Sequence, residues 1–211
     1  MFDILPEWSA LAPFLVAAVA LNLTPGADMT YTIARTAAQG RMAGYASALG
    51  IVGGSLVHTV AATVGLAALV QASPAAFLAI KYLGAAYLLY LAVRLLLARP
   101  ATDADGLGRA GLWQVFAQGV TVNVLNPKVA LFFVAFLPQF VDPAAGPVWL
   151  QMLALGTLFN LGGLLVNGTV ATLVGFGARR IQQSPKVQRA MNVISGTLLG
   201  GLAVRIALTE K

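Results

Sequence analysis

The sequence predicts an all-α polytopic membrane protein in which six transmembrane helices form two inverted three-helix repeats, with helices 1 and 4 broken. Of its 211 residues, 59% are hydrophobic and 9% are charged, whereas about a quarter are charged in an ordinary soluble domain. Apolar segments of about 20 residues, the length that crosses a bilayer, recur along the chain. Proline interrupts two of these segments, and short motifs recur in the same order in both halves.

The predicted spans divide the chain into two halves that form one transmembrane domain. The first three-helix repeat occupies residues 1–98, a cytoplasmic linker residues 99–111, and the second three-helix repeat residues 112–211. The linker is too short for a separate soluble domain. We expect the spans at residues 11–34, 43–70, 75–97, 115–137, 148–177 and 190–208.

Motifs shared by the two halves predict an internal duplication. The pairs are LTPG at 23–26 with LNPK at 125–128, ALG at 48–50 and 154–156, and LAVR at 91–94 and 202–205. A unit of three spans that is repeated once must cross the membrane in the opposite direction the second time. Many secondary transporters have such inverted repeats, with discontinuous helices at corresponding positions and a site near the midplane.

Positive charges occur in alternate loops, and this pattern predicts the orientation. The first loop contains Arg35 and Arg41, the third and fifth loops also contain Lys or Arg, and the second and fourth contain neither. Loops rich in these residues stay in the cytoplasm. We therefore expect loops 1, 3 and 5 in the cytoplasm, both termini outside, and a multi-pass protein of the cell (inner) membrane. The net charge of +6 then reflects topology and not nucleic-acid binding.

Each proline interruption is expected to start a half-helix. Thr24 and Asn126 are of the residue types that cap helix N-termini, and each precedes a proline, Pro25 or Pro127, at the favoured first helical position. Gly26 loosens the first break further. The exposed N–H groups and positive dipole end of such half-helices attract an anion.

Two opposite charges lie beside these breaks. A carboxylate at membrane depth costs roughly 3 kcal/mol on insertion scales, so Asp28 is expected to face protein or a water-filled cavity. Lys128 falls in the first turn of the second half-helix, where the dipole disfavours a cation. A negative group is therefore expected near Lys128, either Asp28 or a substrate carboxylate. In the alternative interpretation, the two residues form only a structural pair between the repeats.

This arrangement indicates a zwitterionic substrate and a coupled proton. An amino acid can present its ammonium group to Asp28 and its carboxylate to Lys128 and the exposed N–H groups. If protonation of Asp28 competes with substrate, transport becomes linked to a proton gradient. Asn22 and Asn123 flank the two breaks and offer further polar contacts.

Three polar residues in other spans are further candidates. His58 suits a proton relay, and a neutral imidazole hydrogen-bonded to a neighbouring helix is the simpler interpretation. Asn160 and Asn167 share one helical face with Gly156 and Gly163. This spacing predicts either close helix packing with amide hydrogen bonds or a lining of the substrate path.

The chain resembles the lysine exporter superfamily (LysE/RhtB), which includes homoserine, threonine, leucine and arginine exporters. The motifs that carry the resemblance are LTPGAD at 23–28, AQGR at 38–41 with Gly44, NVLNPK at 123–128 and ALFFVAFLPQF at 130–140. The resemblance implies an exporter of amino acids or their derivatives in the cytoplasmic membrane, driven by proton antiport. Ala27 departs from the family, which commonly has a second proline there.

Other functions remain as alternatives: a carrier for another small solute, an importer of the same substrates, or a non-transport membrane scaffold. An enzyme is not expected, because the Ser55 and His58 pair lacks an oxyanion motif. The absence of cysteine excludes thiolate metal ligands, and we expect no cofactor and no metal. The expected partners are an amino-acid-like substrate, protons, the lipid bilayer and, for so small a carrier, a second copy in a homodimer.

Overall fold

The computed structural model describes residues 6–66, 74–97, 109–178 and 184–208, and every regular element within these ranges is helical. The elements of the first half are α1 (Trp8–Leu23), α2 (Ala27–Gln39), α3 (Arg41–Ala61) with a π-helical continuation at Ala62–Leu66, and α5 (Pro74–Leu97). Those of the second half are α6 (Leu112–Val124), α7 (Pro127–Leu131) with continuations at Phe132–Phe136 and Leu137–Phe140, α8 (Val148–Leu173) with a continuation at Val174–Ala178, and α10 (Pro185–Leu208).

These helices confirm the all-helical class and both predicted breaks. The stretches Arg41–Gly65, Val148–Gly177 and Pro185–Leu208 are each long and apolar enough to cross a membrane. Two bent pairs make a further span each when a pair is counted as one: Trp8–Leu23 with Ala27–Gln39, bent by 47°, and Leu112–Val124 with Pro127–Phe140, bent by 51°. Residues 67–70 of the second expected span and residues 99–108 of the expected linker lie outside the described ranges.

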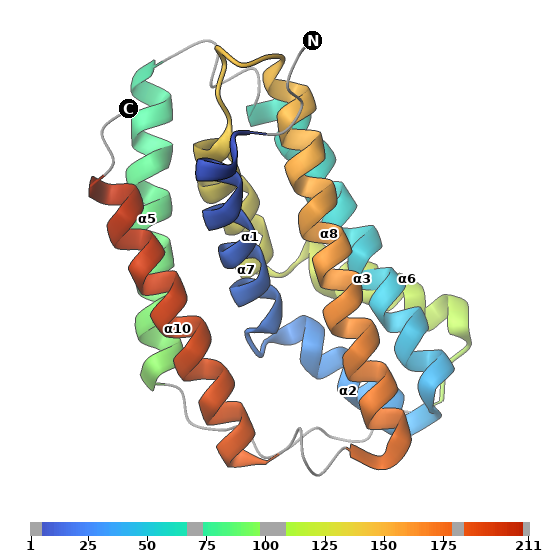
Figure 1. The fold of residues 1–211 in the computed structure, drawn as a ribbon. Helices are drawn as coiled ribbons and strands as arrows, with labels where there is room; N and C mark the ends of the chain where they lie inside the picture. Colours follow the sequence, from blue (N-terminus) through green and yellow to red (C-terminus); the bar gives the residue numbers. More distant parts are fainter. Residues whose placement is uncertain (1–5, 67–73, 98–108, 179–183, 209–211) are drawn as a thin grey trace.

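The helices form two groups around the bent pairs. In Figure 1, α5 and α10 lie side by side at one edge, while α3 lies between α6 and α8 on the other side. Helix α1 contacts both α10 and α8 and so joins the two groups. The largest fully buried side chains at this junction include Phe14, Phe132, Phe136, Met152 and Leu199. At the breaks themselves Thr24 and Asn126 are buried, whereas Leu125 is 73% exposed.

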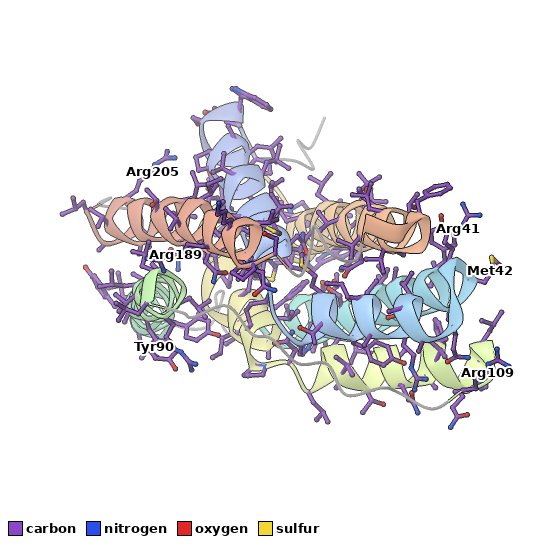
Figure 2. All side chains as sticks on the ribbon, turned by 90° about the horizontal axis from the view of Figure 1, so that it is seen from below. Arg41, Met42, Tyr90, Arg109, Arg189 and Arg205 are labelled. Carbon is purple, nitrogen blue, oxygen red and sulfur yellow. The ribbon has the colours of Figure 1, made fainter. Side chains whose placement is uncertain are left out.

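The outer surface carries large apolar side chains. Met42, Trp113 and Leu165 are 65%, 77% and 71% exposed, and Figure 2 shows side chains radiating from the helices, with Met42 at the periphery. A soluble monomer rarely exposes such extensive apolar surface. This surface is suited to contact with lipid, as expected for a multi-pass membrane protein.

Glycines set the spacing of α3 against α6. A Cβ atom on Gly50 would collide with the Phe116 carbonyl oxygen, and one on Gly119 would lie 2.9 Å from the Ser47 carbonyl oxygen. Small residues at such crossings let helix backbones approach closely. The close approach brings the end of α6, where the second break begins, against the middle of α3.

The expectation that Arg35 lies in the first loop is wrong. Helix α2 continues to Gln39, and a single residue, Gly40, separates it from α3. Gly40 has φ +85°, a backbone conformation that favours glycine, so the chain turns within one residue. Arg35 is consequently part of α2 and only 4% exposed.

Candidate functional site

The second break has the predicted capping. The Asn126 side chain accepts a hydrogen bond from the backbone N–H of Lys128 at 3.1 Å, and Pro127 occupies the first position of α7. Proline fits there because the first N–H groups of a helix have no intrahelical acceptor. The prediction that Asn126 is an N-cap is therefore confirmed.

The first break differs, and the prediction that Thr24 caps a half-helix is wrong. The residue that precedes α2 is Gly26, which gives no side-chain cap. The Thr24 hydroxyl instead donates to the Ala20 carbonyl at 2.7 Å and ends α1. A threonine in the last turn of a helix can reach the carbonyl one turn back. Pro25 and Gly26 then form the extended link, so α2 begins at Ala27.

Lys128 joins the two breaks. Its side-chain ammonium group donates to the Leu21 carbonyl at 3.2 Å and to the Thr24 carbonyl at 3.1 Å. These carbonyls belong to the end of α1, where the helix dipole is negative and the last carbonyls lack intrahelical partners. The negative partner of Lys128 is thus the carboxyl end of α1, the first helix of the opposite bent pair.

Asp28 makes the reciprocal contact. It is the second residue of α2, and its Oδ2 accepts a hydrogen bond from the Asn123 side chain at 3.0 Å, near the end of α6. No ion pair joins Asp28 to Lys128 in the described structure, although both line the same pocket. The start of α2 is therefore bound to the end of α6, and the start of α7 is bound to the end of α1.

The pocket lies between both breaks and helices α3 and α8. The predicted residues that line it are Asn22, Thr24, Asp28, Asn123, Lys128, Asn160 and Asn167. Its apolar wall includes Met29, Ile51, Val52 and Phe159. Pro25, Gly26, Asn126 and Pro127 do not line it and instead shape the two breaks beside it.

The asparagines of α8 and α1 both pack and line the pocket. Asn160 donates to the Thr59 hydroxyl at 3.0 Å, and Asn22 donates to the Phe159 carbonyl at 3.3 Å. Asn167 donates to the Gly163 carbonyl at 3.0 Å and accepts from Thr32 at 3.3 Å. Asn160 and Asn167 thus make the predicted amide hydrogen bonds and also line the pocket.

His58 lies outside the pocket lining. Its Nε2 is 3.2 Å from the Asn123 carbonyl oxygen, and its ring stacks on Phe133 with centroids 5.9 Å apart. The hydrogen bond to a neighbouring helix that the simpler interpretation of His58 predicts is therefore present.

Two groups of polar residues were not singled out as site residues in the sequence. Ser55 lines the pocket, and Thr59, one turn further along α3, binds Asn160. The signal that could have identified them is their spacing of one helical turn, together with Ser47 and Gly50 before them, which are also buried in α3. The second group is centred on Arg35, which donates to Gln39 of α2 and Gln118 of α6.

A helical bundle with lipid-suited outer faces and a polar pocket between two broken spans defines a polytopic membrane protein with an internal candidate site. The chain belongs to the LysE type translocator family, which matches residues 19–210. The resemblance seen in the sequence is thereby confirmed, and the family is one of transporters rather than enzymes.

Curated relatives match over almost the whole chain. An uncharacterized membrane protein of Pseudomonas aeruginosa is 32% identical, over 92% of this chain and 93% of its own. A leucine efflux protein of Salmonella typhimurium is 27% identical, over 99% of this chain and 98% of its own. An uncharacterized membrane protein of Bacillus subtilis is 29% identical, over 95% and 99%. No solved structure matches the chain.

Proposed function

We propose that this protein is a secondary transporter that exports amino acids or amino-acid derivatives across the cytoplasmic membrane by proton antiport. The observation that carries the proposal is the pocket between two broken spans, which places an acid, Asp28, and a base, Lys128, among buried amides. Membership of a translocator family and the similarity to a protein named for leucine efflux support it.

The proposed architecture has six spans in two inverted repeats, 1–98 and 112–211. The 24-residue helix α5 supplies the sixth span, at the position predicted from residues 75–97. Each half then has the same order: a bent pair, a long helix and a second long helix. The similar bends of 47° and 51° at corresponding positions support the duplication, and an odd number of spans per repeat inverts the second one.

The proposed orientation places loops 1, 3 and 5 in the cytoplasm and both termini outside. Arg41 at the start of α3 and Arg109 just before α6 are exposed, and both lie at the periphery in Figure 2. Burial of Arg35 removes one charge from the first loop, but Arg41 keeps the loop positive.

The proposed mechanism uses the two contacts between the breaks. The substrate ammonium group binds Asp28. The Lys128 ammonium group has three N–H bonds, of which two donate to the Leu21 and Thr24 carbonyls. The third N–H of Lys128 donates to the substrate carboxylate. A proton that neutralises Asp28 on the outside weakens its hold on the substrate there. Substrate and proton then alternate on the same carboxylate, as antiport requires.

The test is efflux of radiolabelled amino acids from preloaded proteoliposomes, with and without an imposed pH gradient. We expect gradient-dependent efflux from the wild type and none from Asp28→Asn. The control is Asp142→Asn, the same change at an exposed acid in the turn before α8, which should transport normally.

Three outcomes would contradict the proposal. If the wild type moves no amino acid, the protein is a carrier for another solute or no transporter. If flux runs only inward under the same gradient, it is an importer. If Asp28→Asn transports like the wild type, Asp28 is structural and the proton binds elsewhere.

A further inference from the structure

Four residues that line the pocket each carry a buried oxygen with no hydrogen-bond partner among the described residues. The atoms are Asp28 Oδ1, Ser55 Oγ, Asn123 Oδ1 and Asn160 Oδ1. Ser55, Asn123 and Asn160 are 3%, 1% and 5% exposed. Buried polar atoms are almost always hydrogen-bonded, so a cluster of exceptions in one pocket points to a ligand.

The bonds around the two amides fix which end of each is free. The Thr59 hydroxyl donates its single proton to the Ser55 carbonyl at 2.9 Å, so it must accept from the Asn160 NH₂ group. The NH₂ group of Asn123 likewise donates to the Oδ2 atom of Asp28 at 3.0 Å. In both residues the oxygen is consequently the end that lacks a partner.

The pocket therefore requires hydrogen-bond donors. The nearby cation cannot supply enough of them, because the Lys128 ammonium group donates to the carbonyls of Leu21 and Thr24 and has one N–H left for four oxygens. A primary ammonium group has three N–H donors, a positive charge and no acceptor. It matches an acceptor set that contains one carboxylate, and hydrogen bonds to charged groups are the stronger ones.

We propose that Ser55 and Asn160, together with Asp28, form a receptor for the primary ammonium group of the substrate, and that this group rather than the carboxylate selects the substrate. The inference rests on the proposed function and adds two ligands and a selectivity rule to it. The receptor joins α2, α3 and α8, with Thr59 as a positioning residue that orients the Asn160 amide. N-acylated compounds, which lack the charge and most of the donors, are excluded.

The test is competition binding to the purified wild type at about pH 6, well below the α-amino pKa of roughly 8. The labelled ligand is the amino acid that wild-type proteoliposomes release fastest, and the competitors are its amide and its N-acetyl derivative. We expect the amide, which keeps the ammonium group, to compete within about tenfold of the parent, and the N-acetyl compound to compete at least about a hundredfold more weakly.

Variants then test the two new ligands. Ser55→Ala and Asn160→Leu should each reduce the preference for the parent over its N-acetyl derivative by about tenfold. Ser55→Thr, which keeps the hydroxyl group, and Asn160→Gln, which keeps both the amide oxygen and the NH₂ donor, should retain it. Ser195→Ala and Asn192→Leu are matched controls in α10, because both residues are buried but neither lines the pocket.

The outcomes separate this inference from the proposed function. If the wild type releases no amino acid, the proposed function fails and takes the inference with it. If it releases one but the N-acetyl derivative competes better than the amide, the carboxylate is the selecting group and the inference alone is overturned. The inference is also overturned if binding requires Na⁺ and Ser55→Ala removes that requirement, because the oxygens then bind a metal cation.

Discussion

The Lys128 ammonium group lies 3.1 Å from the Thr24 carbonyl oxygen, so the start of one half-helix binds the end of another. Asp28 and Asn123 form the reciprocal contact at 3.0 Å. Each break in the chain is therefore held by the other bent pair. Any rocking of one pair against the other must break both contacts. The charged side chains that line the pocket, Asp28 and Lys128, therefore also hold the two pairs together.

Replacement of Lys128 by methionine should destabilise the protein. Methionine is unbranched and one atom shorter than lysine, and it leaves the Leu21 and Thr24 carbonyls without their donor, which costs about 1–3 kcal/mol. The measurement is unfolding of the purified protein in detergent. Lys186→Met, at an exposed position near the start of α10, is the control. Equal stability of the two variants would show that the contact at the break contributes nothing to folding.

The spans and breaks could be predicted from the sequence because their causes are local. Apolar length marks a span, and the predicted segment 148–177 coincides with the apolar helical stretch Val148–Gly177. A proline cannot donate a backbone hydrogen bond, so the helix ends before Pro25 and before Pro127. Asn126 as a cap also followed from neighbouring residues alone.

The partners across the pocket could not be predicted in the same way. Lys128 binds backbone carbonyls, and every residue has one, so no side chain in the sequence marks them. The Thr24 hydroxyl could either cap the next helix or donate to a carbonyl in the previous turn. The extended link at Pro25 decides between these two roles. The role of Asn160 depends on Thr59 of another helix, which only the packing brings near.

The two breaks should respond differently to loss of their polar side chains. Asn126→Ala removes a side-chain cap and should cost about 1 kcal/mol. Asn126→Asp keeps an acceptor and should restore most of that loss. Thr24→Val keeps the volume and removes only a bond to a carbonyl within α1, so its effect should be smaller. A larger loss of unfolding free energy for Thr24→Val than for Asn126→Ala would contradict the assigned roles.

Gly50→Ala should disrupt the packing of α3 on α6. The added methyl group meets the Phe116 carbonyl oxygen, part of a rigid helix backbone, and overpacking of this kind costs about 1–3 kcal/mol or more. Gly168→Ala in α8 is the matched control, because a Cβ atom there has no neighbour within 4 Å. The comparison is the yield of monodisperse protein and its unfolding temperature. Equal yields and equal unfolding temperatures of the two variants would show that α3 and α6 can move apart without loss of stability.

His58→Gln should leave the dependence of efflux on the pH gradient unchanged. His58 contacts the Asn123 carbonyl and Phe133 and does not line the pocket. Glutamine keeps a donor for that carbonyl but cannot titrate, so it separates a structural hydrogen bond from a proton site.

The companion variant His58→Phe keeps an aromatic ring against Phe133 and removes the hydrogen bond. It should lower the stability of the protein without changing the ratio of efflux with and without the gradient. If His58→Gln abolishes the response to the gradient while Asp28→Asn retains it, the proton is carried by His58. Asp28 would then serve only to hold Asn123 and the substrate, because a coupling site must bind the proton in competition with the substrate.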